Sequence, residues 1–244
     1  MALLEPVLIQ ATNLGDAWFQ CLHRLIRGPA HEYTITRGSY AGQKRREFDF
    51  VTVHIANPGE RPLAPIMPEG SGIPPPTDEN YINNQYLLYL LTGEKKPNED
   101  YTYGERLVSP ILRLEGKEIP MGVNPLEELV KMYKSQGYGT NQATLEIGMP
   151  SDIILKDPPC LRLIDTRIMQ GKLHIIVYFR SWDLWGGFPA NLGGLQLVKE
   201  YIASEVGVKD GEMVACSKGL HLYDYAWPLA EALTQQKRQP VKEM

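Results

Sequence analysis

The chain has 244 residues, of which 43% are hydrophobic and 22% charged, and its formal net charge is −4. These values are typical of a folded globular protein, and the acidic balance argues against a dedicated nucleic-acid-binding protein, which usually has a basic surface. No run approaches the roughly 18 apolar residues of a membrane-spanning helix, so we expect no membrane segment.

The first third of the chain predicts a helix, a strand and a long loop. Its N-terminal segment lacks a basic lead and is interrupted by Glu5, which is unlike a signal peptide, so we expect a cytoplasmic protein. Apolar residues at helical spacing between 18 and 25 predict a helix that ends at Gly28. Residues 48–55 alternate as a half-buried strand does, and seven prolines in 57–78 predict a long ordered loop.

Further along, helices and strands mix without a regular βαβ alternation. Apolar periodicity and turn signals predict helices at 79–92, 125–135, 191–206 and 226–235, and strands at 172–179 and 213–217. This mixture predicts an α+β fold with one large sheet. The strands on either side of the proline-rich loop share one apolar pattern, so we expect a single domain over residues 1–244.

A lone cysteine is the first candidate for chemistry. Two prolines in the sequence DPPC remove backbone freedom and amide donors just before Cys160, and a thiol on a rigid strand end suits a nucleophile. A free cysteine more often packs in a core, which is our interpretation for Cys21 and Cys216. The three cysteines form no CxxC pair, so we expect a reducing compartment and no zinc site.

Polar residues gather in the sequence FRSWDLWGGFPAN, where a strand gives way to a helix. Arg180 and Ser181 are suited to hold a phosphate, because arginine offers two parallel charged donors. Asp183 either shapes the turn or bonds a backbone amide. Asn191 either caps the following helix or binds a pyrimidine edge, since its carboxamide has both a donor and an acceptor.

A third motif is the pair His221 and Tyr223. If this segment is extended, both side chains lie on one face, where both would donate to sugar hydroxyls. The three motifs have the order PPC, 19 residues, RSxDxxxGxPxN, 29 residues, HxY. As an ordered set they resemble the signature half of thymidylate synthases, over roughly residues 155–235.

This resemblance implies a reaction, a cofactor and an assembly. The chain would be a methyltransferase that converts dUMP to dTMP, with 5,10-methylene-tetrahydrofolate or a methanopterin-type equivalent as the one-carbon donor. The family also implies a large mixed sheet covered by helices on one face, and a homodimer packed through a sheet face. Neither a nucleic acid nor a membrane is an expected partner.

The resemblance also assigns roles to residues of this chain. Cys160 would be the nucleophile that bonds to the pyrimidine ring, and Asp183 would support the carbonyl and amide region of the base. Asn191 would hydrogen-bond the uracil edge. The remaining ligands would be Arg180 and Ser181 for the phosphate, and His221 and Tyr223 for the sugar 3′-hydroxyl.

Upstream the resemblance is looser. The sequence TRGSYAG is similar to the family's phosphate loop and makes Arg37 a phosphate ligand, with Ser39 and Tyr40 nearby. The basic residues 44–46 that follow are interpreted as a solvated turn. The sequence YTYGERL resembles a Tyr-Gly segment that lines the family's site, so Tyr103 is a further candidate.

Departures from the family pattern bear on the site. Leu161 replaces the usual histidine after the nucleophile, and Asn141 and Gln142 stand where a partner subunit's arginine pair is expected. The apolar C-terminal residues that close the folate site are not evident. The catalytic glutamate has no clear counterpart, and Glu69 is a better-spaced candidate than Glu60. These features resemble the divergent archaeal thymidylate synthases and the related pyrimidine-nucleotide hydroxymethylases.

Two rival functions stay open from the sequence. A dCMP or CMP hydroxymethylase would share the fold and the nucleophile but transfer no hydride, and a non-catalytic nucleotide-binding protein would keep the pocket alone. Asn191 favours a uracil nucleotide, because aspartate is expected where the base is cytosine with its amino donor. We therefore expect dUMP or a related pyrimidine nucleotide as the substrate.

Overall fold

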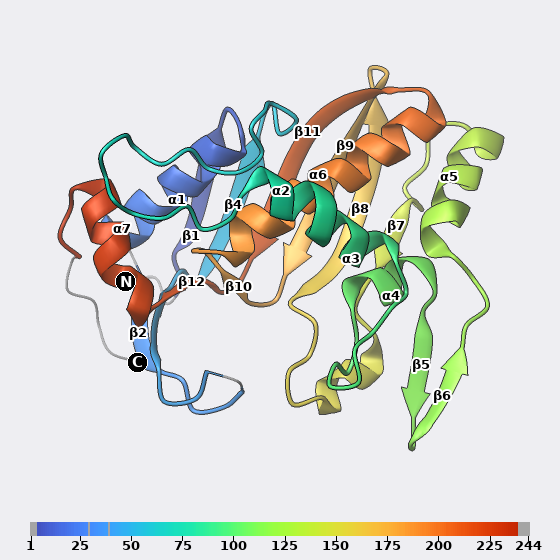
Figure 1. The fold of residues 1–244 in the computed structure, drawn as a ribbon. Helices are drawn as coiled ribbons and strands as arrows, with labels where there is room; N and C mark the ends of the chain where they lie inside the picture. Colours follow the sequence, from blue (N-terminus) through green and yellow to red (C-terminus); the bar gives the residue numbers. More distant parts are fainter. Residues whose placement is uncertain (1–3, 29, 39, 239–244) are drawn as a thin grey trace.

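A mixed six-stranded sheet forms the centre of the computed structural model, which describes residues 4–28, 30–38 and 40–238 (Figure 1). In sheet order its strands are β1 (Pro6–Ala11), β4 (Phe50–Ile55), β11 (Lys209–Ser217), β9 (Lys172–Phe179), β8 (Leu161–Met169) and β7 (Thr144–Glu146). The pairs β1–β4 and β11–β9 are parallel, and the other neighbours are antiparallel.

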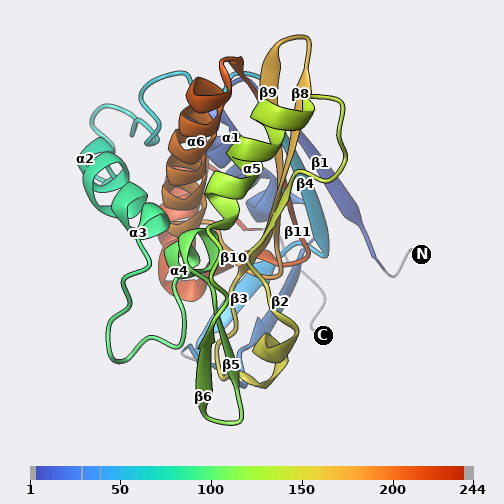
Figure 2. The same cartoon turned by 90° about the vertical axis from the view of Figure 1, so that its right-hand side faces the viewer.

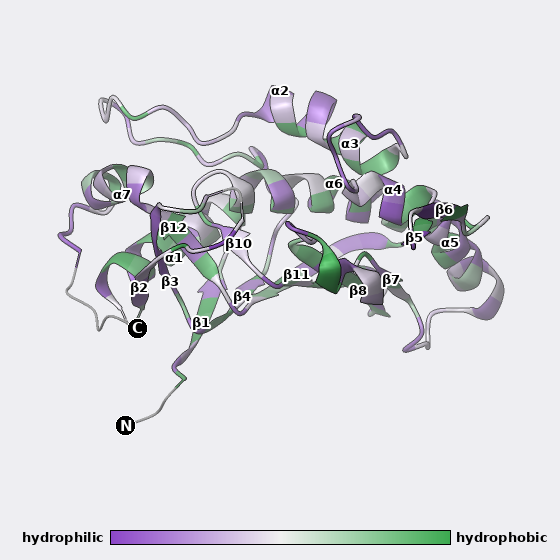
Figure 3. Cartoon of the chain, turned by 90° about the horizontal axis from the view of Figure 1, so that it is seen from below, coloured by the Kyte–Doolittle hydropathy of each residue, from purple (hydrophilic) through white to green (hydrophobic). Residues whose placement is uncertain are grey.

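Helices cover one face of this sheet (Figure 2): α1 (Leu14–Arg27), α5 (Pro125–Gln136) and α6 (Gly187–Val206). The strands alternate accordingly, since Val51, Val53 and Ile55 of β4 are buried while the residues between them are half-exposed. Figure 3 shows the helices and the strands as separate layers. The predicted α+β class, with a large mixed sheet covered by helices on one face, is confirmed.

A second, smaller sheet joins distant parts of the chain. Its strands, in order, are β10 (Trp182–Asp183), β12 (Leu220–Tyr223), β3 (Lys44–Glu47) and β2 (His31–Thr34). β12 pairs antiparallel with β3, so Tyr223 lies opposite Arg45. β10 pairs in parallel with β12 and sets Asp183 beside His221. This sheet therefore brings three candidate segments of the sequence together.

The predicted helix at 79–92 is present but has an irregular centre. Here α2 (Glu79–Tyr81) continues through a π-helical turn (Ile82–Tyr86) into α3 (Leu87–Leu91). The remaining elements are α4 (Tyr103–Val108), the hairpin β5 (Ile111–Leu114) and β6 (Lys117–Pro120), α7 (Trp227–Thr234), and 3₁₀ turns at Pro150–Ile154 and Asp224–Ala226. The helices predicted at 125–135 and 226–235 and the strand at 172–179 are confirmed to within a residue at each end.

Helix α6 begins at Gly187, earlier than the predicted start at residue 191. Asp183 accounts for the difference, because its carboxylate accepts hydrogen bonds from the backbone N–H groups of Gly186 at 3.0 Å and Gly187 at 2.9 Å. Asn191 therefore lies inside the helix, and its interpretation as a helix cap is wrong.

A glycine pair in α6 permits close packing against the π-helical turn. A side-chain carbon at Gly193 would lie 2.9 Å from the Ile82 side chain. At Gly194 it would clash with the ring of Tyr86 and lie 2.9 Å from Cδ1 of Leu90. The ring of Tyr86 thus lies directly against the helix backbone, and α6 fixes its position.

We expect Gly194→Ala to lower the free energy of unfolding by about 1–3 kcal/mol, because overpacking forces buried side chains from their places. Chemical denaturation of the variant and its parent measures the difference. Gly15→Ala is the matched control, since a carbon at Gly15 makes only ordinary contacts in α1. Alanine there should be neutral or stabilising by up to about 1 kcal/mol. Equal stability of Gly194→Ala and the parent would contradict the packing argument.

Candidate active site

Most of the predicted site residues line one cavity of about 470 Å³. The cavity lies between the second sheet and the turn that precedes β8, and its volume is typical of a small-molecule site. The predicted residues on its wall are Cys160, Arg37, Arg180, Ser181, Asp183, His221 and Tyr223.

The turn that carries Cys160 is held by Arg180. Nε of Arg180 donates to the carbonyls of Pro158 at 3.2 Å and Pro159 at 3.1 Å, and Nη2 also donates to Pro158. The backbone N–H of Arg180 donates to the Cys160 carbonyl at 2.8 Å. Because the prolines themselves have no N–H group, the turn depends on donors from outside it. Cys160 therefore lies directly before β8, on a turn held by one arginine.

Burial governs the state of the Cys160 thiol. Burial raises its pKa above the ordinary value, and the nearby Arg180 guanidinium offsets part of this effect. The thiol is therefore protonated at neutral pH in the free protein. Tyr103 fixes the following residue, since its hydroxyl accepts a hydrogen bond of 3.2 Å from the Leu161 backbone N–H.

The sequence interpretation of residues 44–46 as a solvated turn is wrong. These residues belong to β3, which is paired on both sides, and Arg46 is buried with an ion pair of 2.8 Å to Glu32. Neighbouring residues of a strand face opposite sides, so Arg45 lines the cavity instead. Lys156 lines it as well, and no motif in the sequence marks this lysine as a site residue.

The loop after β2 forms one side of the cavity. Arg37 is exposed there and Gly38 has a positive φ of 89°, a turn conformation that glycine adopts readily. Tyr40 stacks on Tyr223 with 4.3 Å between ring centroids. Ser39, which the sequence places nearby, lies outside the described residues.

His221 presents an acceptor rather than a donor to the cavity. Its Nδ1 lies 2.8 Å from the Gly219 carbonyl, which only accepts, so Nδ1 carries the proton. Nε2 is buried and has no hydrogen-bond partner among the described residues. Burial lowers the pKa of His221 to about 4, so the ring is neutral at neutral pH. The expectation that His221 donates is therefore wrong, and its Nε2 is an acceptor. The His221 ring meets the Tyr223 ring edge-on, with 4.7 Å between the ring centroids.

Asp183 and Asn191 are both engaged by neighbours. The Asp183 carboxylate accepts from the backbone N–H groups of residues 185–187 at 2.9–3.2 Å, so it shapes the turn. Burial raises the pKa of Asp183, and these three bonds oppose the rise. Asn191 lies off the cavity wall, where its Oδ1 accepts from Trp182 Nε1 at 2.9 Å and its Nδ2 donates to the Tyr86 hydroxyl.

Glu69 is not brought to Cys160. It is exposed on the proline-rich loop and does not line the cavity. The loop is tied to helix α6 instead, through an ion pair of 2.7 Å between Arg61 and Glu200. Spacing along an irregular loop does not determine its path in space, which is why the sequence could not place this carboxylate.

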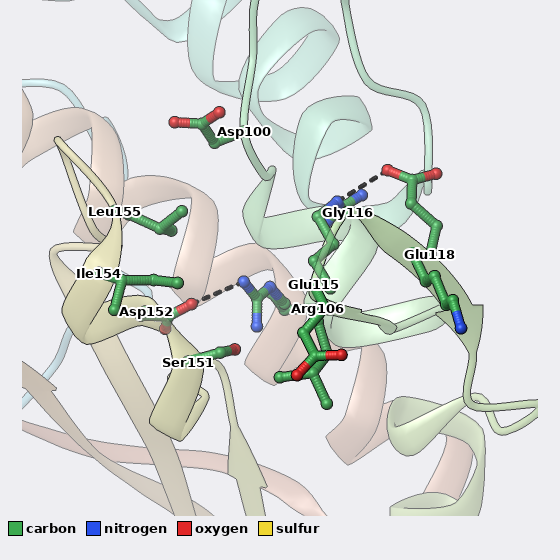
Figure 4. Close-up of a pocket in the computed structure, with 12 residues that line it drawn as sticks. Asp100, Arg106, Glu115, Gly116, Glu118, Ser151, Asp152, Ile154 and Leu155 are labelled. Atoms are coloured by element: carbon green, nitrogen blue, oxygen red, sulfur yellow. Dashed lines mark hydrogen bonds and ion pairs between the residues drawn. The ribbon is translucent and has the colours of Figure 1, made fainter.

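A second cavity of about 300 Å³ lies between the hairpin β5–β6 and the turn Pro150–Ile154 (Figure 4). Arg106 of α4 is only 4% exposed and pairs with Asp152 at 2.8 Å. Asp152 also accepts from Arg162 Nη1 at 2.9 Å and from the Met149 backbone N–H at 2.7 Å. These charges tie α4 to the segment that leads into the cysteine turn.

The described residues contain neither a cluster of metal ligands nor a membrane-spanning helix. Among them, no three His, Cys, Asp or Glu side chains lie close enough together to hold a metal ion. In the same part of the chain, no helix is long and apolar enough to cross a bilayer. The three cysteines are free thiols.

Comparison with known proteins finds relatives along nearly the whole chain. The family model described as Thymidylate synthase matches residues 111–244. A protein of Methanosarcina acetivorans, named as a thymidylate synthase by inference, is 31% identical over 228 residues, covering 93% of this chain and 94% of that protein. A similarly named protein of Methanothermobacter thermautotrophicus is 26% identical over 229 residues, covering 91% of this chain and 96% of that protein.

Two further relatives extend the comparison. The deoxyuridylate hydroxymethyltransferase of Bacillus phage SP01 is 37% identical over 117 residues, which are 44% of this chain and 30% of that protein. The structure of thermostable thymidylate synthase A from Bacillus subtilis superposes with a TM-score of 0.67, over 95% of this chain and 87% of that one, at 16% identity. This structural likeness shows the same fold.

We expect the ring signals of His221 to stay unchanged in NMR spectra from about pH 8 to pH 5.5, because burial lowers its pKa to about 4. Imidazole in an unfolded chain titrates near 6.5. The folded pKa lies below the unfolded one, so His221 contributes stability above about pH 6.5 that is lost as the pH falls towards 4. His221→Gln assigns the signals. A midpoint near 6.5 in the folded protein would contradict the burial argument.

Proposed function

We propose that this chain, which belongs to the thymidylate synthase family, converts dUMP to dTMP by reductive methylation while Cys160 is bonded to the pyrimidine ring. One observation carries the proposal: a cysteine, several cations and a neutral histidine acceptor meet on one cavity wall. These groups correspond to the parts of a nucleotide, since cations suit the phosphate, the acceptor suits a sugar hydroxyl and the thiol suits the ring.

The phosphate would bind among Arg37, Arg180 and Ser181, as the family resemblance implies. Arg180 uses Nε and Nη2 to hold the cysteine turn, which leaves Nη1 for an anion. Arg45 and Lys156 line the same cavity and add positive charge. We propose that they take the place of the arginine pair that a partner subunit would lend, because this chain has no arginines at the expected positions.

The sugar 3′-hydroxyl would donate to His221 Nε2 and accept from the Tyr223 hydroxyl. Burial raises the pKa of Tyr223, so this hydroxyl keeps its proton and remains a donor. The neutral His221 ring remains an acceptor down to about pH 4. The two side chains therefore offer one hydrogen-bond donor and one acceptor to the same sugar hydroxyl across the physiological range of pH.

Cys160 would act as the nucleophile. Its thiol loses a proton and the sulfur bonds to ring carbon 6, while the electrons of the 5,6 double bond move towards carbon 5 and the 4-carbonyl oxygen. Carbon 5 then bonds to the one-carbon unit and loses its hydrogen as a proton, and the bond that joins this unit to its donor would break. The sulfur leaves when the new carbon is reduced to a methyl group. Burial disfavours the Cys160 thiolate. The positively charged Arg180 is the main group that stabilises this thiolate.

A reduced pterin would supply the methylene carbon and, in a synthase, the hydride. Tyrosine rings gather next to the cysteine turn, with centroids 5.6 Å apart for Tyr86 and Tyr89 and 6.0 Å apart for Tyr89 and Tyr103. Tyr101 and Tyr103 lie 6.2 Å apart. Flat aromatic faces suit a pterin ring, so we propose these residues as its contacts, whether the donor is 5,10-methylene-tetrahydrofolate or a methanopterin-type equivalent.

A hydroxymethyltransferase is the second candidate, favoured by the likeness to the phage deoxyuridylate hydroxymethyltransferase. It would use the same cysteine and nucleotide site but would add water, rather than hydride, to the new carbon. A cytosine-specific hydroxymethylase or a non-catalytic nucleotide-binding protein would also keep this fold. The identity of the product separates all of these functions.

We also propose a homodimer packed through the open face of the large sheet. In Figure 2 no described helix covers this face. Ile176 of β9 is 39% exposed on it and lies in register with Val214 of β11. Apolar side chains on a broad face without helices suit contact with another chain.

We place the protein in the cytoplasm, because its cysteines are free thiols.

We expect Cys160→Ala to lower turnover of dUMP by at least about a thousandfold, because loss of a covalent nucleophile removes the bonded intermediate. Its dissociation constant for dUMP should stay within about threefold of the parent's, since the proposed phosphate and sugar ligands are unchanged. Turnover assays and calorimetry measure the two quantities. Cys216→Ala, which removes a thiol from β11, is the matched control and should keep the activity of the parent. Retained turnover in Cys160→Ala would exclude the nucleophile assignment.

For the dimer, we expect Ile176→Arg to give a monomer, because a buried unpaired charge is costly at an interface. Light scattering after size exclusion measures the mass of the particle. Tyr201→Arg is the matched control, since Tyr201 is 41% exposed on helix α6. An unchanged mass for Ile176→Arg, or a monomeric parent, would contradict packing through the sheet face.

A further inference from the structure

A chain of hydrogen bonds reaches Asn191 from both sides. Trp182 Nε1 donates to Asn191 Oδ1 at 2.9 Å, and Asn191 Nδ2 donates to the Tyr86 hydroxyl. An indole N–H can only donate, so the amide atom that faces it must be the oxygen. Trp182 therefore determines which way the Asn191 amide points, and the amide nitrogen faces Tyr86.

Trp182 has little freedom to move. It is only 1% exposed and is stacked between Phe179, at 4.1 Å between ring centroids, and Phe188, at 4.5 Å. Close-packed aromatic neighbours hold a side chain in one rotamer. The direction of the Asn191 amide is therefore set by a rigid group.

Tyr86 is held at the other end of the chain of bonds. It closes the π-helical turn, and its ring lies against Gly194 of α6. A π-helical turn changes the direction in which the following side chains point and is frequent at functional sites. Burial raises the pKa of Tyr86. Its ring stacks on Tyr89, and Tyr89 meets Tyr103, whose hydroxyl accepts from the backbone N–H of the residue after Cys160.

This network presents hydrogen-bond donors. Because the Tyr86 hydroxyl accepts from Asn191, its own proton points elsewhere, and no acceptor binds that proton among the described residues. The raised pKa of Tyr86 means that the proton stays in place at neutral pH. The second N–H of the Asn191 amide is a further donor.

We infer that Trp182 and Tyr86 are positioning residues that give this site a preference for uracil over cytosine. They aim hydrogen-bond donors at the 4-position of the base, where uracil has a carbonyl that accepts and cytosine has an amino group that donates. The inference rests on the proposed function and on the role that the family resemblance implies for Asn191, at the edge of the base. A carbonyl oxygen accepts two hydrogens, whereas an amino group that faces donors leaves buried groups unpaired. Sites built on such hydrogen bonds discriminate strongly between substrates.

Trp182→Phe keeps the aromatic stack and removes the indole donor, so the Asn191 amide is free to turn over. We expect the preference for dUMP over dCMP, measured as the ratio of dissociation constants by calorimetry, to fall about tenfold. Most of the change should be tighter binding of dCMP. Trp227→Phe is the matched control, because Trp227 is also buried and its indole donates to the Leu222 carbonyl at 3.1 Å.

Tyr86→Phe removes one donor without changing the shape of the ring. We expect weaker binding of dUMP, by about fivefold to tenfold, and no loss of dCMP binding. Tyr133→Phe is the matched control, since the buried Tyr133 hydroxyl bonds Thr166 at 2.7 Å on another part of the core. If Tyr86 had a purely structural role, its loss would weaken the binding of dUMP and dCMP equally and would leave the ratio of their dissociation constants unchanged.

Three results decide between the possibilities. A parent that prefers dUMP, with the preference lost in both network variants and kept in both controls, supports the inference. An unchanged preference in folded Trp182→Phe and Tyr86→Phe, or a parent that binds both nucleotides equally, overturns it and leaves the proposed function standing. A parent that binds neither nucleotide overturns the proposed function and the inference together.

Discussion

The geometry and the reactivity of Cys160 depend on one side chain, the guanidinium of Arg180. Pro158 and Pro159 leave the cysteine turn without amide donors, and Arg180 holds both of their carbonyls while its backbone N–H holds that of Cys160. The same guanidinium is the strongest cationic influence on the thiol. Position and charge are therefore coupled, since any displacement of Arg180 alters where the sulfur lies and how readily it ionises.

Around this turn, the cavity combines groups that stay charged with groups that burial keeps neutral. Arg45 and Arg180 bring positively charged guanidinium groups to the cavity wall. Burial keeps His221 and the thiol of Cys160 uncharged. A nucleotide has the same division, with an anionic phosphate attached to a neutral sugar and base. This correspondence is the physical reason for assigning the cavity to a nucleotide.

Sequence patterns predicted the cysteine turn better than the strands and loops that surround it. Cys160 and Arg180 could be placed because prolines and a strong strand signal mark their positions locally. Arg45 could not, since KRRE has no apolar alternation and its strand exists through pairing with β2 and β12, which lie far away in the chain. Asn191 lies inside α6 because that helix begins at Gly187, whose backbone N–H donates to the Asp183 carboxylate, earlier than local propensity indicates. The path of the loop that carries Glu69 depends on its attachment to α6, which no local pattern contains.

The most direct test of the proposed function is the release of tritium from dUMP labelled at carbon 5, because loss of that hydrogen requires attack at carbon 6 and substitution at carbon 5. The purified protein would be supplied with methylene-tetrahydrofolate, and in a second series with a methanopterin-type donor, and the nucleotide product identified. We expect release together with dTMP. Release with a hydroxymethyl product would assign the second candidate function instead. Binding of dUMP without release of tritium with either donor would contradict catalysis by Cys160.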